Sequence, residues 1–417
     1  MKKIVCLILL SGILSSSFAE DMAPLEMPST RSLGMGGTHV AYTDDVYALF
    51  VNPAALQKAN QGSGFELSPA FVGPFFDLIG LAASSGDDLM ESLGDFTGKT
   101  GGKIPIVVDE RGPLSVGYAA NGLGWGIWNR IHAGATVIGT DIDASALVDL
   151  IANFGMSFRI LRLENHEVDA GFVVKPFLRA KADMDMAALD MIGGGLGDML
   201  DEFNVPLILG AGFDLGFMYR FYDDLAVGLT IDDVYTGGGR IATVYGNDDG
   251  VSSYRIPTTL NMGVAYTLQP IPWLGLAFML DYRDVTNLFF IDDYTKRNPI
   301  LNLAFGTELS IYQFLKLRFG LNEMLPAVGL GLVAKAFQFN VAIYGRELDN
   351  EPGGFSAYGL DLSISVRPET EKREWPWSPP ILNLILGKEA PPEDTSAEAE
   401  AAAAGALGRL DAARGRP

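Results

Sequence analysis

The chain has 417 residues, with 51 acidic against 30 basic side chains, and its formal net charge is −21 at pH 7. This balance excludes nucleic acid as a partner, because surfaces that bind nucleic acid must be basic. Mean hydropathy is +0.20, which is high for so acidic a chain.

The N-terminus has the pattern of a secretory signal peptide. Lys2 and Lys3 precede an apolar run from Ile4 to Leu14, and small residues lead up to Ala19. So short a run cannot span a bilayer as a helix, which takes ~20 residues. We expect residues 1–19 to be removed. Because the only cysteine lies in this segment, the mature chain can form no disulfide and offers no thiolate to a metal.

Residues 20–62 hold a group of turn-forming and small residues ahead of the first expected strand. Glycine allows close backbone approach and positive φ, and Asn-Pro favours a turn. The glycines are not followed by the Lys-Ser/Thr of a phosphate loop, and a plain turn before a strand is the simpler alternative. The residues that stand out are Gly34, Gly36, Gly37, Asp44, Asp45, Asn52, Pro53 and Ala54.

From residue 63 to residue 367, apolar residues alternate with small or polar ones. Between Leu207 and Phe221 the odd positions are apolar, whereas the even positions include Asp214 and Arg220. A period of two with one apolar face predicts strands rather than helices. The expected strands are 64–72, 114–120, 124–139, 154–162, 167–180, 206–221, 225–233, 257–268, 273–283, 300–311, 315–322, 327–334, 337–346 and 356–366.

The apolar face of these strands must meet either a second sheet or lipid. Lipid is favoured because the opposite face is mostly Gly and Ala with scattered charges, and because aromatic residues gather near strand ends, as in interfacial girdles. We therefore predict an all-β fold, a transmembrane antiparallel β-barrel of about fourteen strands over residues 63–367. A soluble β-protein is the alternative. The polar residues expected to face the lumen are Asp214, Arg220, Asp281, Glu308, Arg318 and Asp361.

The expected connections alternate in length. Those after even-numbered strands are short, whereas those after odd-numbered strands, such as 73–113 and 140–153, are mostly long, with 323–326 as an exception. This is the arrangement of outer-membrane barrels, with the short turns in the periplasm. Residues 86–99 and 183–203 mix acidic residues with Leu and Met, so we expect short loop helices that either capture apolar ligands or cap the barrel.

Residues 368–417 depart from the usual barrel ending, a terminal aromatic on the last strand. They contain Trp375-Pro376-Trp377 and then a run rich in Ala and Glu, which predicts a periplasmic, mostly disordered extension. The extension offers a binding site for a periplasmic partner. It also raises the question of how the barrel-assembly machinery recognises the chain.

Candidate chemistry is sparse. The three histidines, His39, His132 and His166, lack metal-ligand spacing, and no Gly-x-Ser-x-Gly motif is present. We expect no metal, no cofactor and no enzymatic activity.

Residues 31–56 closely resemble the N-terminal segment of FadL-type outer-membrane transporters for long-chain fatty acids and aromatic hydrocarbons. They are also similar to PorV-like secretion-system relatives and to spirochaete members of the family. The matching features are the Gly-x-Gly-Gly stretch, the acidic pair before an aromatic residue, and Asn-Pro-Ala. The resemblance implies a fourteen-stranded barrel whose N-terminal hatch, residues 20–62, plugs the lumen; beyond the motif, strand number and loop alternation agree.

Two functions follow as expectations from this resemblance. The first is passive uptake of hydrophobic small molecules such as long-chain fatty acids, gated by the hatch, across the outer membrane of a diderm bacterium. The alternative is a non-transporting barrel among the outer-membrane lipids that serves as a docking or scaffold subunit. An apolar pocket between the loops and the hatch would favour transport. A closed, charge-bridged lumen with an ordered C-terminal tail would favour docking.

Overall fold

The computed structural model describes residues 20–74, 103–138, 141–187, 205–222, 224–245, 253–285, 297–334, 337–354 and 356–366. The chain divides into two units, Met1–Lys372 and Arg373–Pro417, and every described residue belongs to the first. The expected signal peptide, the expected helix at 86–99 and the C-terminal extension with Trp375-Pro376-Trp377 lie outside the described residues.

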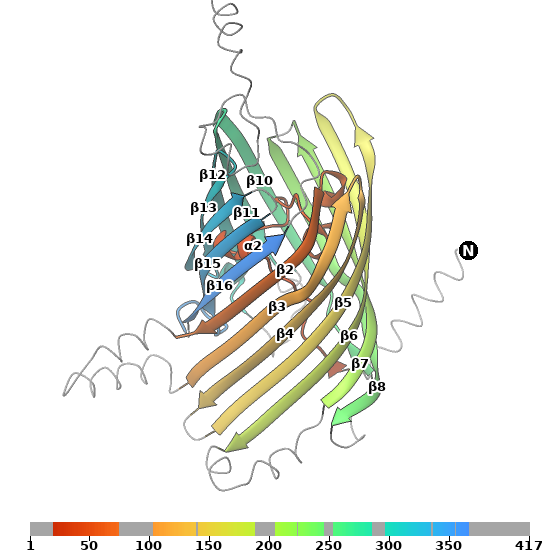
Figure 1. Cartoon of the computed structure of the whole chain (residues 1–417), viewed down its shortest axis with the longest axis vertical. Helices are drawn as coiled ribbons and strands as arrows, with labels where there is room; N and C mark the ends of the chain where they lie inside the picture. Colours follow the sequence, from red (N-terminus) through yellow and green to blue (C-terminus); the bar gives the residue numbers. More distant parts are fainter. Residues whose placement is uncertain are drawn as a thin grey trace, which may run out of the picture. The chain divides into compact units, whose positions relative to one another are not determined.

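One sheet, whose ring strands all pair antiparallel, closes on itself to form the barrel (Figure 1). The sheet has 16 strands, of which β1 and β9 branch off β8, so that fourteen close the ring. The ring closes where β16 pairs with β2, for example Leu360 with Phe71. Its strands are β2 (Asn60–Gly73), β3 (Lys103–Ala120), β4 (Leu123–Ile138), β5 (Asp141–Arg162), β6 (His166–Ala187), β7 (Val205–Phe221), β8 (Leu225–Tyr245), β10 (Thr259–Ile271), β11 (Leu274–Tyr282), β12 (Leu303–Ile311), β13 (Leu315–Asn322), β14 (Leu325–Ala334), β15 (Phe337–Glu347) and β16 (Ser356–Val366).

The predicted alternation is confirmed as a division between the outer and inner faces of the barrel. On β4, the apolar side chains of Trp125 and Ile127 are exposed on the outer face. The positions between them, Gly126 and Trp128, are buried inside. A closed ladder leaves no sheet edge, so an apolar outer face can meet lipid without unpaired backbone groups.

Aromatic side chains gather at the short-turn end of the barrel. Trp273 and Tyr312, from neighbouring turns, stack with ring centroids 5.6 Å apart, and Phe221 meets Tyr222 edge-on at 4.7 Å. Rings of this kind suit the membrane–water interface, where an apolar body and a polar tip are both accommodated.

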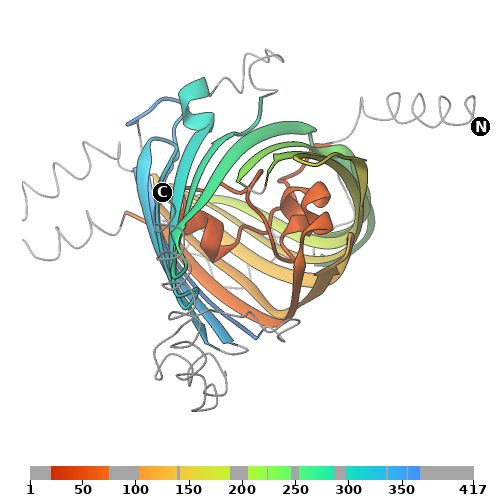
Figure 2. The same cartoon turned by 90° about the horizontal axis from the view of Figure 1, so that it is seen from above.

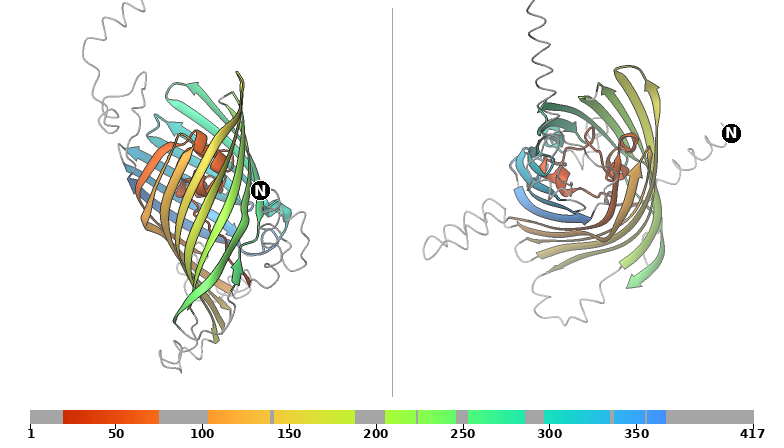
Figure 3. Two further views of the ribbon diagram at one scale, coloured as in Figure 1. Left: turned by 90° about the vertical axis from the view of Figure 1, so that its right-hand side faces the viewer. Right: turned by 45° about the horizontal axis from the view of Figure 1, so that its top comes forward.

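Several strands are longer than predicted (Figure 3). β5 and β6 have 22 residues each and β8 has 21. The expected long loop 140–153 is wrong, because β5 begins at Asp141, directly after β4 ends at Ile138. Alanine pairs with alanine in this part of the ladder, where Ala133 faces Ala146 and Ala135 faces Ala144. Apolar and polar positions therefore differ too little for alternation to show in the sequence. The backbone ladder alone extends these strands.

Two other boundaries are corrected as well. β3 begins at Lys103 rather than at 114, and β6 continues to Ala187. The helix expected from residue 183 therefore starts within a strand, and the rest of its range lies outside the described residues. No helix among the described residues is long and apolar enough to cross a membrane.

The N-terminal segment lies inside the ring of strands (Figure 2). It begins with β1 (Glu20–Asp21), which pairs with β9 (Ser253–Arg255). It contains three short helices, and a fourth, η3, precedes β12. These helices are α2 (Thr30–Gly34), α3 (Ala48–Val51), η2 (Pro53–Gln57) and η3 (Pro299–Asn302).

The N-terminal segment crosses the lumen from the end with long connections to the end with short turns. At its start, the N–H of Met22 donates to the carbonyl of Arg255 at 2.8 Å. At its end, the N–H of Gly122, in the short turn between β3 and β4, donates to the carbonyl of Leu56 at 3.0 Å. An even number of strands predicts both termini of the chain at the short-turn end. This holds for the start of β2 and the end of β16, but it is wrong for the described N-terminus, because the chain first crosses the lumen from the other end.

Candidate functional site

Glycines of the N-terminal segment pack directly on the barrel wall. A Cβ added to Gly34 would lie 2.9 Å from the Cα of Gly329 on β14. Gly36 has a φ of +68°, and a Cβ there would lie 2.4 Å from the carbonyl oxygen of Leu321. A Cβ on Gly320 of β13 would lie 2.4 Å from the Gly36 nitrogen. Backbone therefore meets backbone at this contact, which only glycine permits.

The Asn52-Pro53-Ala54 turn is buried against the opposite wall. The Asn52 amide donates to the carbonyl of Val40 at 2.9 Å and to that of Phe217 on β7 at 3.3 Å, and its oxygen accepts the N–H of Ala54 at 3.1 Å. A Cβ on Gly216 would lie 2.3 Å from this side-chain oxygen. The turn thus fits against wall glycines.

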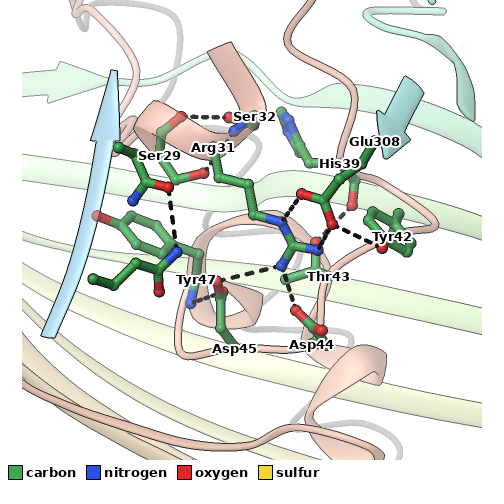
Figure 4. Close-up of polar contacts among 12 residues, drawn as sticks. Ser29, Arg31, Ser32, His39, Tyr42, Thr43, Asp44, Asp45, Tyr47 and Glu308 are labelled. Atoms are coloured by element: carbon green, nitrogen blue, oxygen red, sulfur yellow. Dashed lines mark hydrogen bonds and ion pairs between the residues drawn. The ribbon is translucent and has the colours of Figure 1, made fainter. Parts of the chain in front are cut away.

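Arg31 of α2 joins two parts of the N-terminal segment to the wall (Figure 4). Its guanidinium lies 2.5 Å from Asp44 and 3.1 Å from Glu308 of β12, and Asp45 is 3.9 Å away. Arg318 of β13 donates to the same Glu308 carboxylate at 2.8 Å. Burial opposes the charge of Arg31, but Asp44 and Glu308 hold its pKa well above its ordinary value.

A second polar group joins the segment to β16, β2 and β3. Thr30 donates to Asp361 at 2.5 Å, and Arg111 of β3 forms a buried ion pair with the same carboxylate. Tyr47 donates to Glu66 of β2, also at 2.5 Å. Hydrogen bonds to buried charges are stronger than neutral ones and are costly to leave unmade.

A third contact fixes the loop between α2 and α3. One oxygen of Asp281, on β11, accepts the backbone N–H groups of His39 at 2.7 Å and Val40 at 3.0 Å. The His39 side chain lies beside this contact. Burial, and secondarily the charge of Arg283, lowers the pKa of His39 to about 4.

Two barrel arginines hold the start of the segment by its backbone. Arg179, paired with Asp149, donates to the carbonyl of Ala23 at 2.5 Å. Arg130, paired with Asp109, donates to the carbonyl of Glu26 at 3.0 Å. Each arginine is oriented by a carboxylate of the wall, so its remaining donors point to the chain in the lumen.

The six residues expected to face the lumen are all buried inside the ring, but they do not act as one group. Asp281, Glu308, Arg318 and Asp361 belong to the contacts just described. Asp214 instead pairs with Lys175 at 2.7 Å and Arg220 with Asp169, all four on β6 and β7.

Sequence reasoning missed seven of the residues just described whose side chains join the segment to the wall. Alternation would have placed some of them on the inner face, but nothing in the sequence names their partners, because the path of the segment through the lumen decides those contacts. These residues are Thr30, Arg31, Tyr47, Glu66, Arg111, Arg130 and Arg179. Within the described ranges, no group of three or more His, Cys, Asp or Glu side chains is arranged to hold a metal ion.

A closed fourteen-stranded ring with an apolar outer face and a filled lumen defines the class of outer-membrane-type β-barrels. No family model and no curated protein matches the chain. Similar solved structures include the toluene transporter TodX of Pseudomonas putida, at 14% identity and a TM-score of 0.48, covering 82% of this chain and 98% of that one. The toluene transporter TbuX of Ralstonia pickettii has 14% identity and a TM-score of 0.46, with coverage of 84% and 99%.

A FadL homologue from Pseudomonas aeruginosa is also similar, at 10% identity and a TM-score of 0.28, with 85% of this chain and all of that one covered. At identities and TM-scores this low, the likeness concerns the fold alone.

Proposed function

We propose that this protein is a passive channel for hydrophobic small molecules in the outer membrane of a diderm bacterium, with the N-terminal segment as its hatch. The observation that carries the proposal is an interruption of the barrel wall at β3. There the β3–β4 pairs stop at Arg111 and resume at Val116, so four residues of β3, 112–115, lie opposite two of β4. On the other side of the same stretch, the β2–β3 register shifts around Glu66.

The local sequence explains the interruption. Gly112 has a φ of +102°, and a Cβ there would lie 2.0 Å from the carbonyl oxygen of Glu66, so only glycine fits. Pro113 offers no N–H to the ladder. Leu114 is 62% exposed on the outer face, whereas Ser115 is 1% exposed on the inner face. A break of this kind suits lateral passage between lumen and lipid, because the backbone pairs that would oppose passage are already missing.

The contacts of the segment support its role as a hatch. Its polar contacts are hydrogen bonds and ion pairs to the inner wall, and its apolar residues, such as Leu49 and Leu56, belong to one buried cluster with the inward residues Trp128 and Phe177. Contacts of both kinds can break and re-form without disturbing the lipid-facing side chains. Long-chain fatty acids are the ligands proposed first, from the sequence resemblance. The names of TodX and TbuX give toluene as their cargo, so a monoaromatic compound is the second ligand to test.

Uptake by cells tests this proposal. In a host that lacks its own fatty-acid channel, expression of the chain should raise uptake of radiolabelled oleate above that of the vector alone. Asn52→Ala removes three hydrogen bonds of the hatch turn and should lower this uptake, while the barrel remains heat-resistant in detergent. A correctly inserted barrel that raises uptake of neither oleate nor toluene would overturn the proposal.

A docking or scaffold role is the second candidate, and one observation favours it. The inner wall carries buried ion pairs such as Arg318–Glu308 and Arg111–Asp361, and Arg31 of the segment is paired with the same Glu308, which suits a barrel that stays closed. Residues 368–417, which would meet the periplasmic partner, lie outside the described residues. Affinity capture of inserted barrels with and without residues 368–417 tests this role: a periplasmic protein retained only by the full chain, together with absent uptake, would favour it.

A further inference from the structure

One side chain, Asn129 of β4, bridges the interruption in β3. Its amide nitrogen donates to the carbonyl oxygen of Gly112 at 2.7 Å, and the backbone N–H of Leu114 donates to its amide oxygen at 2.8 Å. These two backbone groups flank Pro113. A single carboxamide therefore replaces the backbone pairs that are missing between β3 and β4.

Asn129 occupies an outward position of β4. Ile127 and Ile131, on either side of it in the alternation, are exposed on the outer face, and its ladder partner on β5, Leu150, is exposed there too. A carboxamide among lipid-facing isoleucine and leucine side chains costs free energy unless it is hydrogen-bonded. The Gly112 and Leu114 backbone groups would be equally costly if left unpaired in hydrocarbon. The Asn129 carboxamide and these two backbone groups therefore satisfy each other's hydrogen-bonding needs.

The inner side of the interruption touches the hatch. Ser115, at the end of the bulge, pairs in the ladder with Glu66 of β2. Glu66 accepts the hydrogen bond from Tyr47 of the N-terminal segment, and the Tyr47 ring lies 5.7 Å from that of Trp128, the residue before Asn129. Contacts of the hatch and contacts of the bulge are thus made by adjacent residues.

We propose that Asn129 is the latch of a lateral opening in the barrel wall. This inference rests on the proposed channel function. With both hydrogen bonds of the Asn129 carboxamide made, the wall is closed to lipid. When both break, residues 112–115 separate from β4, and the inner position of Ser115 becomes continuous with the membrane. A hydrophobic molecule that leaves the lumen at this point passes between β3 and β4 into the bilayer.

A cysteine reporter tests the latch without any transport assay. The only native cysteine is Cys6, in the expected signal peptide, so Ser115→Cys places one thiol at the inner side of the bulge. The protein is reconstituted in phosphatidylcholine vesicles and treated with a lipid-soluble maleimide. Asn129→Leu, which removes both hydrogen bonds, should raise the labelling rate about tenfold, the order expected for two lost hydrogen bonds.

Ile131→Leu is the matched control, because it changes the next outward residue of β4 and leaves the amide in place. Labelling at the same rate in all three proteins, or an equal rise in the control, would overturn the latch. Asn129→Ser, whose side chain is too short to make both bonds, provides a second variant if Asn129→Leu fails to insert, and should also label faster.

Failure of the latch and failure of the channel are distinguishable. Faster labelling of Ser115→Cys in Asn129→Leu without any uptake of oleate by the unmodified chain would keep the latch and contradict the channel. Uptake by the unmodified chain with labelling unaffected by Asn129→Leu would keep the channel and contradict the latch.

Discussion

Single glycines decide how closely the N-terminal segment approaches the wall. Gly320 of β13 and Gly36 face one another, and the Cβ of any other residue at 320 would come within 2.4 Å of the Gly36 nitrogen. The atoms nearest to such a Cβ belong to the backbone of the N-terminal segment, so no flexible side chain can move aside to make room. Overpacking at such a contact typically costs ~1–3 kcal/mol, which is of the same order as the polar contacts that hold α2.

Gly320→Ala should therefore displace the hatch while leaving the barrel intact. Faster hydrogen–deuterium exchange is expected across residues 31–47, with unchanged heat resistance of the folded band in detergent. Gly275→Ala is the matched control, because its Cβ would meet only the Ser310 Cβ at 3.4 Å. Exchange in residues 31–47 that is the same in both variants would contradict the close contact.

The lowered pKa of His39 predicts a pH dependence of the same segment. In the folded segment His39 binds a proton less readily than a free histidine, with a pKa of about 4 against an ordinary 6.5. Its contribution to stability is therefore fully present above pH 6.5 and is lost as the pH falls towards 4. As the pH falls from 6.5 to 4, hydrogen–deuterium exchange in residues 37–47 should accelerate relative to that of His39→Gln at the same pH. Parallel pH profiles of the two proteins would contradict a role of His39 in this pH dependence.

Inward positions could be predicted from the sequence residue by residue, but their partners could not. Alternation placed Asp281, Glu308 and Asp361 on the lumen side, where the structure has them. Their hydrogen-bond partners on the segment are the backbone N–H groups of His39 and Val40 for Asp281, Arg31 for Glu308 and Thr30 for Asp361. A short helix such as α2 has no strong sequence signal, so its orientation, and hence these contacts, depends on packing inside the closed barrel.

The strands were predictable where lipid imposes a period of two and less so where it does not. All fourteen ring strands coincide with expected ones, yet β3, β5 and β8 extend well beyond them. Outside the apolar band, backbone pairing suffices to continue a strand, and residues such as Asp141 or Ala144 carry no alternation. The bulge at Gly112-Pro113 was missed for a related reason: it lies before the expected start of that strand at 114.

The lipid-facing side of a strand should tolerate no charge. Leu280 of β11 is 51% exposed on the outer face, and Leu280→Arg would place a guanidinium in lipid at a cost of ~2–4 kcal/mol near the midplane. Leu348→Arg makes the same change after β15 has ended, at a residue that is 42% exposed. The folded fraction after refolding into vesicles should fall only for Leu280→Arg; equal losses would contradict a lipid-facing β11.

At the scale of the whole molecule, the barrel and its contents are held by different forces. The ring is a continuous backbone ladder closed between β16 and β2, and such ladders do not depend on what fills the lumen. The N-terminal segment, by contrast, is held by side-chain contacts and close glycine packing to both walls, with backbone hydrogen bonds near its two ends, and it ends where β2 begins at Asn60. Removing residues 20–59 therefore deletes no ring strand.

This deletion should give a barrel that inserts but no longer excludes solutes. The deleted residues include Arg31 and Tyr47, so Glu308 and Glu66 would lose these partners and face water in the emptied lumen, where exposed charge is inexpensive. Conductance in planar bilayers and leakage of small hydrophilic solutes from vesicles should both rise, while the folded band in detergent stays heat-resistant. Asn52→Ala, which loosens the hatch turn without removing it, should leave conductance near that of the unmodified chain. A deleted barrel that inserts yet conducts no better would show that something other than the N-terminal segment closes the lumen, and would end the hatch interpretation.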